Sequence, residues 1–223
     1  MSEHDGHRQR MKQRFLRHGL ENFDDHNVLE LLLFYAQPRQ DTNLIAHRLM
    51  DTFGTLDRVF SATPEELMTV TGVKENAAVL IRLVGEAGRR YLIAREEADS
   101  ILSSVEKSGA YLIPRFMHSR NETVYLVCLD AKYQVLDCCM ISEGGLTSAR
   151  LNLRQIVQTA LMKNARYAIL AHNHTSGIAL PSPEDRAATL KVRDALATVE
   201  VDLVDHIIVA GTDFVSLADD GLL

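Results

Sequence analysis

Tryptophan is absent from the sequence, and cysteine and proline are scarce, with three and five residues among 223. The cysteines have neither the spacing of a zinc finger nor the pattern of a disulfide framework, so we expect reduced thiols in a cytoplasmic protein. They are Cys128, Cys138 and Cys139. No apolar run is long enough to cross a bilayer, and the first residues lack the apolar region of a secretory signal. These absences argue against a disulfide-rich secreted domain and predict no membrane association.

A broad excess of positive charge is also missing, since 24 Lys and Arg residues face 30 Asp and Glu residues. Residues 1–100 and residues 101–223 each have a net charge of -3. This balance argues against strong non-specific binding of nucleic acid by charge alone. The local exception is residues 8–19, in which five basic side chains surround Met11, Phe15 and Leu16. This segment predicts a basic amphipathic helix that packs on the next element.

What the sequence does contain, over residues 1–98, is helical periodicity without a strand pattern. With 46% hydrophobic residues, the chain can form one or two domains with their own cores. Residues 28–34 and 44–50 have helical periods, and Gly54 is placed to end the second of these helices. We therefore predict a small all-helical domain at the start of the chain.

Residues 64–95 predict a short helix, a tight turn and a long helix, an order similar to a helix-hairpin-helix unit. In such a unit, backbone amides of the hairpin and of the following helix contact a DNA phosphate. Gly72, Val73 and Lys74 are therefore candidate DNA-binding residues. Lys74 stands where such hairpins usually have a second glycine, and three glutamates lie nearby, so a unit for helix packing or protein contact remains the alternative.

A polar run at residues 96–100 marks the expected boundary between a helical domain, 1–98, and a second domain, 99–223. Beyond it, helical and strand patterns interleave, which predicts an α/β fold with a mixed sheet flanked by helices. The expected helices are 103–118, 152–164 and 183–197, and the expected strands are 122–129, 134–142, 166–171, 202–209 and a short one near Phe214.

The residues with most potential chemistry follow the expected strand 166–171. His172 and His174 are two apart, so in an extended chain both imidazoles point to the same side. Ser182, Pro183 and Asp185 then form the pattern of a helix start, which fixes the carboxylate of Asp185 in the first turn. Two imidazoles and one carboxylate with an open fourth position are the ligands of a catalytic zinc site, which lowers the pKa of a bound water to about 7.

Each half of this pattern also has a structural interpretation. Ser182 and Asp185 alone can be a capping box, and His172 and His174 alone can be hydrogen-bonded histidines of a strand end. Their conjunction favours the metal site, because neither interpretation needs the other half of the pattern.

The spacing His172-x-His174, seven residues, Ser182, two residues, Asp185 matches without a gap the zinc signature of the JAMM (MPN-plus) metalloproteases. The His-Asn-His-x-Ser-Gly form and the segments 205–209 and 214–223 resemble the bacterial RadC family (UPF0758), over nearly the whole chain. Where that family usually has proline after the second histidine, this chain has Thr175, which makes the loop less rigid.

The resemblance implies a JAMM-type mixed sheet and a glutamate on an upstream strand that acts as general base. The candidates are Glu122, which precedes an apolar strand, and Glu143, which we place in a turn because glycines follow it. We choose Glu122. Ser182 would donate a hydrogen bond to the developing oxyanion. Asp205 and His206 are interpreted as part of a strand and not as a second metal site.

The expected function is thus a Zn²⁺-dependent hydrolase that cleaves a peptide or isopeptide bond in a protein or peptide substrate. One alternative is a DNA-binding protein, either a repair or recombination accessory or a nuclease, that contacts DNA through its helical domain. The contiguous letters His-Asn-His do not indicate an HNH nuclease, whose residues are dispersed. Another alternative is a non-catalytic interaction module stabilised by zinc. The sequence carries no signal for the oligomeric state.

Overall fold

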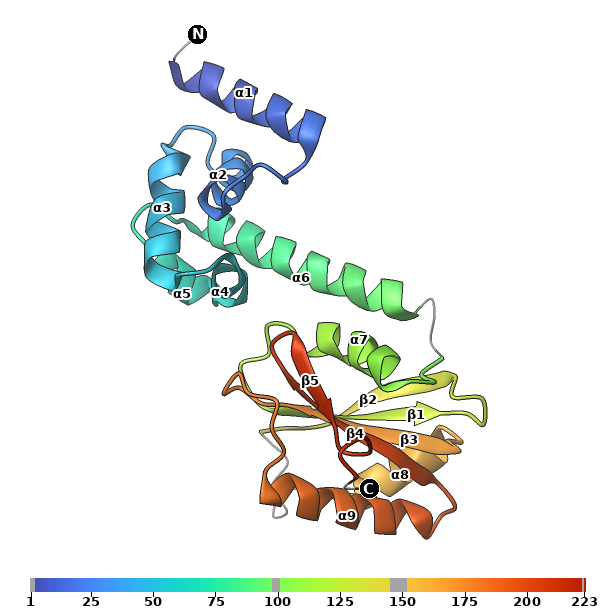
Figure 1. Cartoon of the computed structure of the whole chain (residues 1–223). Helices are drawn as coiled ribbons and strands as arrows, with labels where there is room; N and C mark the ends of the chain where they lie inside the picture. Colours follow the sequence, from blue (N-terminus) through green and yellow to red (C-terminus); the bar gives the residue numbers. More distant parts are fainter. Residues whose placement is uncertain (1–2, 98–100, 145–151, 222) are drawn as a thin grey trace. The chain divides into compact units, whose positions relative to one another are not determined.

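The computed structural model describes residues 3–97, 101–144, 152–221 and 223. Its packing divides the chain into two compact units, Met1–Gly88 and Arg89–Leu223. Figure 1 shows the first as helical and the second as a sheet covered by helices. The division falls inside helix α6 (Glu75–Glu97). The domain boundary predicted after residue 98 stays a prediction. Residues 89–97 of α6 are grouped with the second unit, in which Glu97 pairs with Arg115. In the described part of the chain, no helix is long and apolar enough to cross a membrane.

The helical unit packs around a core of large aliphatic side chains. Leu29, Leu33, Leu49, Leu67 and Ile81 are all fully buried in it. Its helices before α6 are α1 (Glu3–His18), α2 (Asp25–Ala36), α3 (Thr42–Phe53), α4 (Leu56–Ser61) and α5 (Pro64–Met68).

The ends of these helices follow from local side chains. Gly54 ends α3 with a φ of 83°, as the sequence predicts, and this left-handed conformation favours glycine. Helix α4 begins where the hydroxyl of Thr55 accepts a hydrogen bond from Arg58 N, and it was not predicted. Its six residues are too few to produce a recognisable apolar period.

The turn between α5 and α6 contains the three candidate DNA-binding residues. Gly72 has a φ of 101°, and a Cβ atom there would lie 2.8 Å from Cγ1 of Ile45, so only glycine fits. Val73 is buried in the helical core, and its N–H donates to the carbonyl of Val70 at 3.0 Å. Lys74 is exposed. The amide of Val73 is therefore used within the fold, and the DNA contact of this turn remains a prediction.

The second unit is built on one five-stranded sheet in the order β2-β1-β3-β4-β5. Only β3 and β4 are parallel, so the sheet is mixed and the predicted α/β class is confirmed. The strands are β1 (Thr123–Leu129), β2 (Val135–Glu143), β3 (Tyr167–Asn173), β4 (Asp202–Ala210) and β5 (Asp213–Ser216). The helices are α7 (Val105–Phe116), α8 (Leu153–Met162) and α9 (Pro183–Ala197).

Helices cover both faces of this sheet (Figure 1). One core cluster joins α7 to alternate residues of the central strands, including Val127 and Ile169. The other joins α8 and α9 to the intervening residues, including Leu126 and Leu170. Because side chains alternate along a strand, His172 follows Leu170 onto the face that α9 covers.

Two details differ from the sequence-based expectation. Strand β3 runs on to Asn173, because His172 and Asn173 still pair with Ile208 and Val209 of β4. Glu143 is the last residue of β2 and lies opposite Thr123, so its placement in a turn was wrong. Glu143 is extended because the pairing of β2 with β1 continues as far as this residue.

Candidate metal centre

The strand end and the helix start bring the three predicted ligands together. The Nε2 atoms of His172 and His174 are 3.0 Å apart. Asp185, in the first turn of α9, places Oδ1 3.2 Å from His172 Nε2 and Oδ2 3.4 Å from His174 Nε2. The side chains of His172, His174 and Asp185 are 1%, 15% and 7% exposed, so the cluster is nearly closed to solvent and opens on the side of His174.

These distances fit a small divalent cation. A tetrahedral ion with bonds of 2.0–2.1 Å to nitrogen and oxygen holds its ligand atoms about 3.3 Å apart. The three measured separations, 3.0, 3.2 and 3.4 Å, bracket this value. Among the residues that the structure describes, this is the only group of three His, Cys, Asp or Glu side chains that converges in this way.

A chain of buried hydrogen bonds determines which nitrogen of His172 carries its proton. The hydroxyl of Thr189 donates its hydrogen to the carbonyl oxygen of Asp185 at 2.6 Å. Since that hydrogen is used, Oγ1 of Thr189 must accept from Nδ1 of His206, also at 2.6 Å. Burial, the largest contribution, lowers the pKa of His206 well below its ordinary value, so this ring is neutral. Its Nε2 therefore accepts from Nδ1 of His172 at 2.8 Å, which leaves Nε2 of His172 with a free lone pair.

The loop after His174 places the proton of this ring on Nδ1, as in His172. Nδ1 of His174 lies 3.2 Å from the carbonyl oxygen of Ile178, which can only accept, so Nδ1 carries the proton. The two Nε2 atoms and the carboxylate of Asp185 then face one another with no hydrogen atom between them. Lone pairs 3.0 Å apart repel unless a cation lies among them, which is a second reason why these residues fit a metal ion.

The carboxylate of Asp185 is held ionised by its neighbours. Burial, the largest contribution, acts to raise the pKa of Asp185, while hydrogen bonds from the hydroxyl and the N–H of Ser182 act to lower it and favour the ionised form. Oδ2 accepts from Ser182 Oγ at 2.6 Å and from Ser182 N at 2.9 Å. Ser182 Oγ in turn accepts from Asp185 N at 3.1 Å, which completes a capping box. The capping interpretation is thus confirmed, and it is compatible with Asp185 as a candidate metal ligand.

Glu122 lies immediately before β1, is half-buried, and is not one of the three converging side chains. Val124 pairs with His172 in an antiparallel register, and this pairing of β1 with β3 ends there, two residues after Glu122 and two residues before His174. The start of β1 is fixed there because Asn173 Oδ1 accepts from Thr123 N at 2.7 Å and Asn173 Nδ2 donates to Asn121 O at 3.2 Å.

His206, Thr189 and Asn173 are the residues that the sequence analysis missed. His206 does lie in a strand, as expected, but its ring also sets the proton position of His172. Thr189 is one helical turn after Asp185, a spacing that would have indicated a shared face of α9. No sequence signal connects His206 with Thr189, because the contact forms only when α9 packs on β4.

Comparison with known proteins gives a consistent result. A family model described as "RadC-like JAB domain" matches residues 102–222. A UPF0758 protein of Bordetella parapertussis is 35% identical over 215 residues, which are 95% of this chain and 94% of the relative. Another, from Fusobacterium nucleatum, is 31% identical over the full length of both chains. A third, from Idiomarina loihiensis, is 31% identical over 96% of each chain. These relatives are named by a family designation that states no activity.

Proposed function

The chain belongs to the RadC-like JAB domain family, and from that premise we propose that it is a zinc-dependent hydrolase of JAMM type. The observation that carries the proposal is the convergence of three lone-pair donors, His172 Nε2, His174 Nε2 and a carboxylate oxygen of Asp185, at 3.0–3.4 Å. Two imidazoles and one carboxylate are the donor set of catalytic zinc sites. A Zn²⁺ ion held there supplies a Lewis acid and makes water a nucleophile at neutral pH.

In this proposal Glu122 is the general base. Support comes from its position two residues before Val124, which pairs with His172. In the proposed reaction its carboxylate would take a proton from the attacking water and return it to the leaving amine. Such general acid–base work contributes about 10²–10⁴-fold to the rate.

Ser182 has two functions in the proposal. Its hydroxyl hydrogen now goes to Asp185 Oδ2 at 2.6 Å, which orients that ligand. Donating to an oxyanion requires Ser182 to exchange this bond for one to the substrate during the reaction.

The substrate class proposed is a peptide or isopeptide bond in a protein. The loop between His174 and α9 supports a substrate with apolar side chains, because Ile178 and Leu180 are 64% and 68% exposed there. Large aliphatic side chains held in solvent next to a catalytic cluster offer apolar contact to a bound chain. Ile178 is also tied to the cluster, since its carbonyl oxygen accepts from His174.

The test combines metal content with hydrolysis of a quenched-fluorescent peptide library. We expect stoichiometric zinc in the wild type and in Glu122→Gln, with hydrolysis about 10²–10⁴-fold slower in the variant. His174→Ala should lose both zinc and hydrolysis. A wild type without stoichiometric metal, or an unchanged metal content in His174→Ala, contradicts the site.

The same variants separate the catalytic proposal from a structural metal. If Glu122→Gln behaves as wild type in every assay while chelation lowers the melting temperature, the zinc stabilises a non-catalytic interaction module. If metal-dependent cleavage occurs on DNA and not on peptides, the chain is a nuclease.

A further inference from the structure

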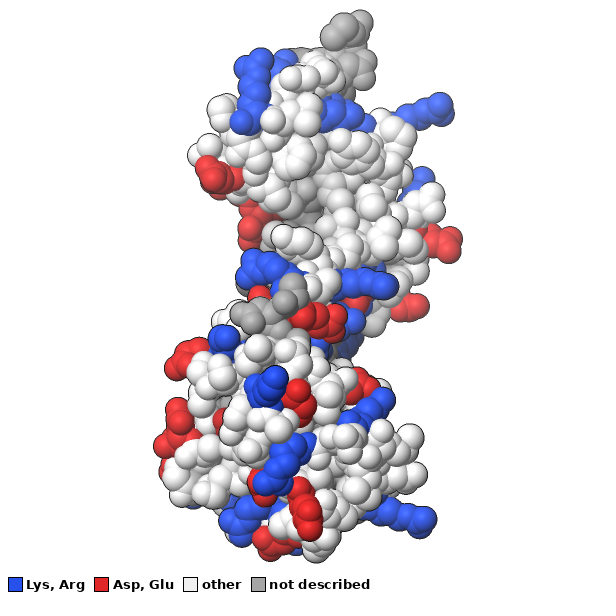
Figure 2. All heavy atoms as spheres, turned by 90° about the vertical axis from the view of Figure 1, so that its right-hand side faces the viewer, with Lys and Arg blue, Asp and Glu red and all other residues white. Residues whose placement is uncertain are grey.

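Acidic side chains are common on this protein, so the type of residue does not by itself make Glu122 a general base. The chain has 30 Asp and Glu residues, and Figure 2 shows acidic and basic side chains mixed over much of the face that it displays. A stronger indication is the way in which the main chain around Glu122 is held. Its two neighbours in the sequence, Asn121 and Thr123, both form hydrogen bonds to one buried side chain, that of Asn173.

Asn173 lies where strand β1 separates from strand β3. The pairing of these strands ends at Val124 and His172. Beyond this pair the side chain of Asn173 connects the strands, because Oδ1 accepts from Thr123 N at 2.7 Å and Nδ2 donates to Asn121 O at 3.2 Å. The partners determine the orientation of the amide, since a main-chain N–H can only donate and a carbonyl oxygen can only accept. The two bonds therefore hold the main chain on both sides of the residue between Asn121 and Thr123.

The end of β2 holds the same segment from its other side. Gly144 N donates to Glu122 O at 2.6 Å, and Asn121 Nδ2 donates to Glu143 Oε1 at 2.9 Å. The main chain around Glu122 is thus bonded to the end of β2 and to the side chain of Asn173. The contacts to Asn173 differ from those to β2 because they lead directly to the two candidate histidine ligands, which are the residues on either side of Asn173.

Strand β4 holds the main chain of Asn173 separately from its side chain. Asn173 pairs with Val209 in the parallel register of β3 and β4. The next residue continues this contact, since His174 N donates to Val209 O at 2.8 Å. These main-chain contacts do not involve the amide group of Asn173. Removal of that amide should therefore release the segment that contains Glu122, while the candidate metal ligands stay in place.

From these contacts we infer that Asn173 is a positioning residue, which holds the main chain of Glu122 at a fixed place relative to the metal ligands. This role rests on the proposed function, in which Glu122 is the general base. A general base must lie within hydrogen-bond reach of the water from which it takes a proton. A misplacement of about 1 Å can cost about 10²-fold in rate. The amide suits this role because one planar group gives an acceptor to one neighbour of Glu122 and a donor to the other.

The experiment uses the full chain and compares the wild type, Asn173→Ala, Glu122→Gln and the double variant. Zinc content is measured in each of them. The constants kcat and KM are measured on the quenched-fluorescent peptide that the wild type hydrolyses fastest, and hydrogen exchange is followed at individual main-chain amides. Asn173→Leu replaces Asn173→Ala if the smaller side chain prevents folding, because leucine branches at the same carbon as asparagine and has no hydrogen-bonding group.

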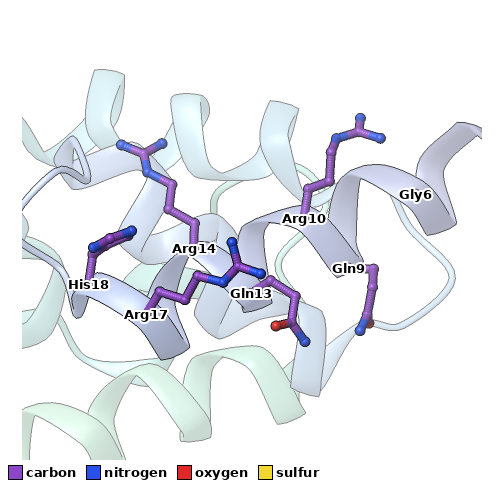
Figure 3. A pocket seen from close by; sticks show the side chains of 7 residues that line it. All are labelled: Gly6, Gln9, Arg10, Gln13, Arg14, Arg17 and His18. Carbon is purple, nitrogen blue, oxygen red and sulfur yellow. The ribbon is translucent and has the colours of Figure 1, made fainter.

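Two control variants remove an amide side chain elsewhere. Asn152→Ala deletes the group that accepts from Gln155 N at the start of α8, so it tests a loss of local stability in the second unit. Gln13→Ala deletes an exposed amide of α1, which Figure 3 shows, so it tests the same change of chemistry in the helical unit. Both controls should match the wild type in zinc content and in kcat.

We expect Asn173→Ala to keep stoichiometric zinc, with kcat lower by about 10–10²-fold and KM changed by less than about twofold. In the Glu122→Gln background, the same substitution should change kcat by less than about twofold, because a residue that acts through the base has no effect once the base is removed. The amide of Thr123 should exchange faster in Asn173→Ala, since it loses its acceptor, and the amide of His174 should exchange as in the wild type.

Equal losses of kcat in the two backgrounds, or loss of zinc from Asn173→Ala, would show that Asn173 does not act through Glu122. An unchanged kcat in Asn173→Ala, together with slow hydrolysis by Glu122→Gln, would show that the hydrogen bonds of Asn173 do not position the base. A wild type that hydrolyses no peptide, or a Glu122→Gln variant as active as the wild type, contradicts the proposed function, and the role of Asn173 is then overturned with it.

Discussion

Two helices in this protein begin with nearly the same four residues, Thr63-Pro64-Glu65-Glu66 at α5 and Ser182-Pro183-Glu184-Asp185 at α9. Their local geometry is also nearly the same. Glu66 accepts from Thr63 N at 2.8 Å and Asp185 accepts from Ser182 N at 2.9 Å. The reciprocal bonds to the hydroxyl oxygens are 3.2 Å and 3.1 Å. Both are capping boxes with proline in the first turn.

The two capping boxes differ in which side chains lie near the acidic residue, Glu66 at α5 and Asp185 at α9. Strand β3 and the residue that follows it bring the Nε2 atoms of His172 and His174 within 3.4 Å of the carboxylate oxygens of Asp185. The box at α5 contributes to no such cluster in the described residues. A capping box therefore fixes a carboxylate in the first turn of a helix, and only the neighbouring strand makes the carboxylate of Asp185 a candidate metal ligand.

The largest expected contrast is between Asp185→Ala and Glu66→Ala. Asp185→Ala removes a ligand, so metal affinity should fall by more than the roughly 10–100-fold typical of outer-shell changes, and stoichiometric metal should be lost. Glu66→Ala should leave metal content unchanged and cost about 1 kcal/mol of stability. Elemental analysis and thermal unfolding measure the two effects. Equal metal content in Asp185→Ala and wild type would falsify the contrast.

The next contrast uses the threonines that follow each box. Thr189 donates to the carbonyl oxygen of Asp185 and is fully buried, whereas Thr69 donates to that of Glu66 and is exposed. Thr189→Val leaves the N–H of His206 without an acceptor, so we expect a loss of about 1–3 kcal/mol and metal affinity about 10–100-fold weaker. Thr69→Val should stay within about 0.5 kcal/mol of wild type. Calorimetric titration measures the metal affinity of both variants. An unchanged affinity in Thr189→Val would show that the hydrogen bonds through Thr189 and His206 do not affect metal binding.

A smaller contrast is expected at the capping residues themselves. Thr63→Ala and Ser182→Ala should each cost about 1 kcal/mol, because each removes the acceptor of one helix N–H. Ser182→Ala also deletes the 2.6 Å bond to Asp185 Oδ2, so metal affinity should fall by up to about tenfold in this variant only. Denaturant unfolding without metal measures the loss of stability, and titration with metal measures the loss of metal affinity. Loss of stability at α5 but not at α9 would argue against the shared capping role.

The smallest effects are expected at Glu65 and Glu184, where the two helix starts should behave alike. Both side chains are exposed in the first turn, near the positive end of the helix dipole. Glu65→Gln and Glu184→Gln should each cost about 0.3–1 kcal/mol at low salt and less at high salt. Thermal unfolding at two salt concentrations measures this. A change of metal content in Glu184→Gln would show that Glu184 takes part in the site.

The sequence predicted which segments of the second unit form strands and helices better than it predicted where the strands end. Alternating and continuous apolar runs located all five strands, and the pattern Ser182-Pro183-Glu184-Asp185 located the start of α9. The end of β3 was misplaced by two residues, because pairing with β4 carries the strand through His172 and Asn173. Glu143 was misplaced for the same reason, since strand pairing overrides the turn tendency of the glycines after it.

By itself, the sequence determined the local parts: two imidazoles on one side of an extended chain, and a carboxylate fixed by a helix start. These follow from the backbone periods of strand and helix, which depend only on neighbouring residues. The tertiary structure alone decided that these parts meet at 3.0–3.4 Å. It also decided that His206 and Thr189, 17 positions apart, hold the proton of His172 away from the site. Such contacts depend on how α9 packs across β3 and β4, and that packing is set by the whole buried core and not by any single motif.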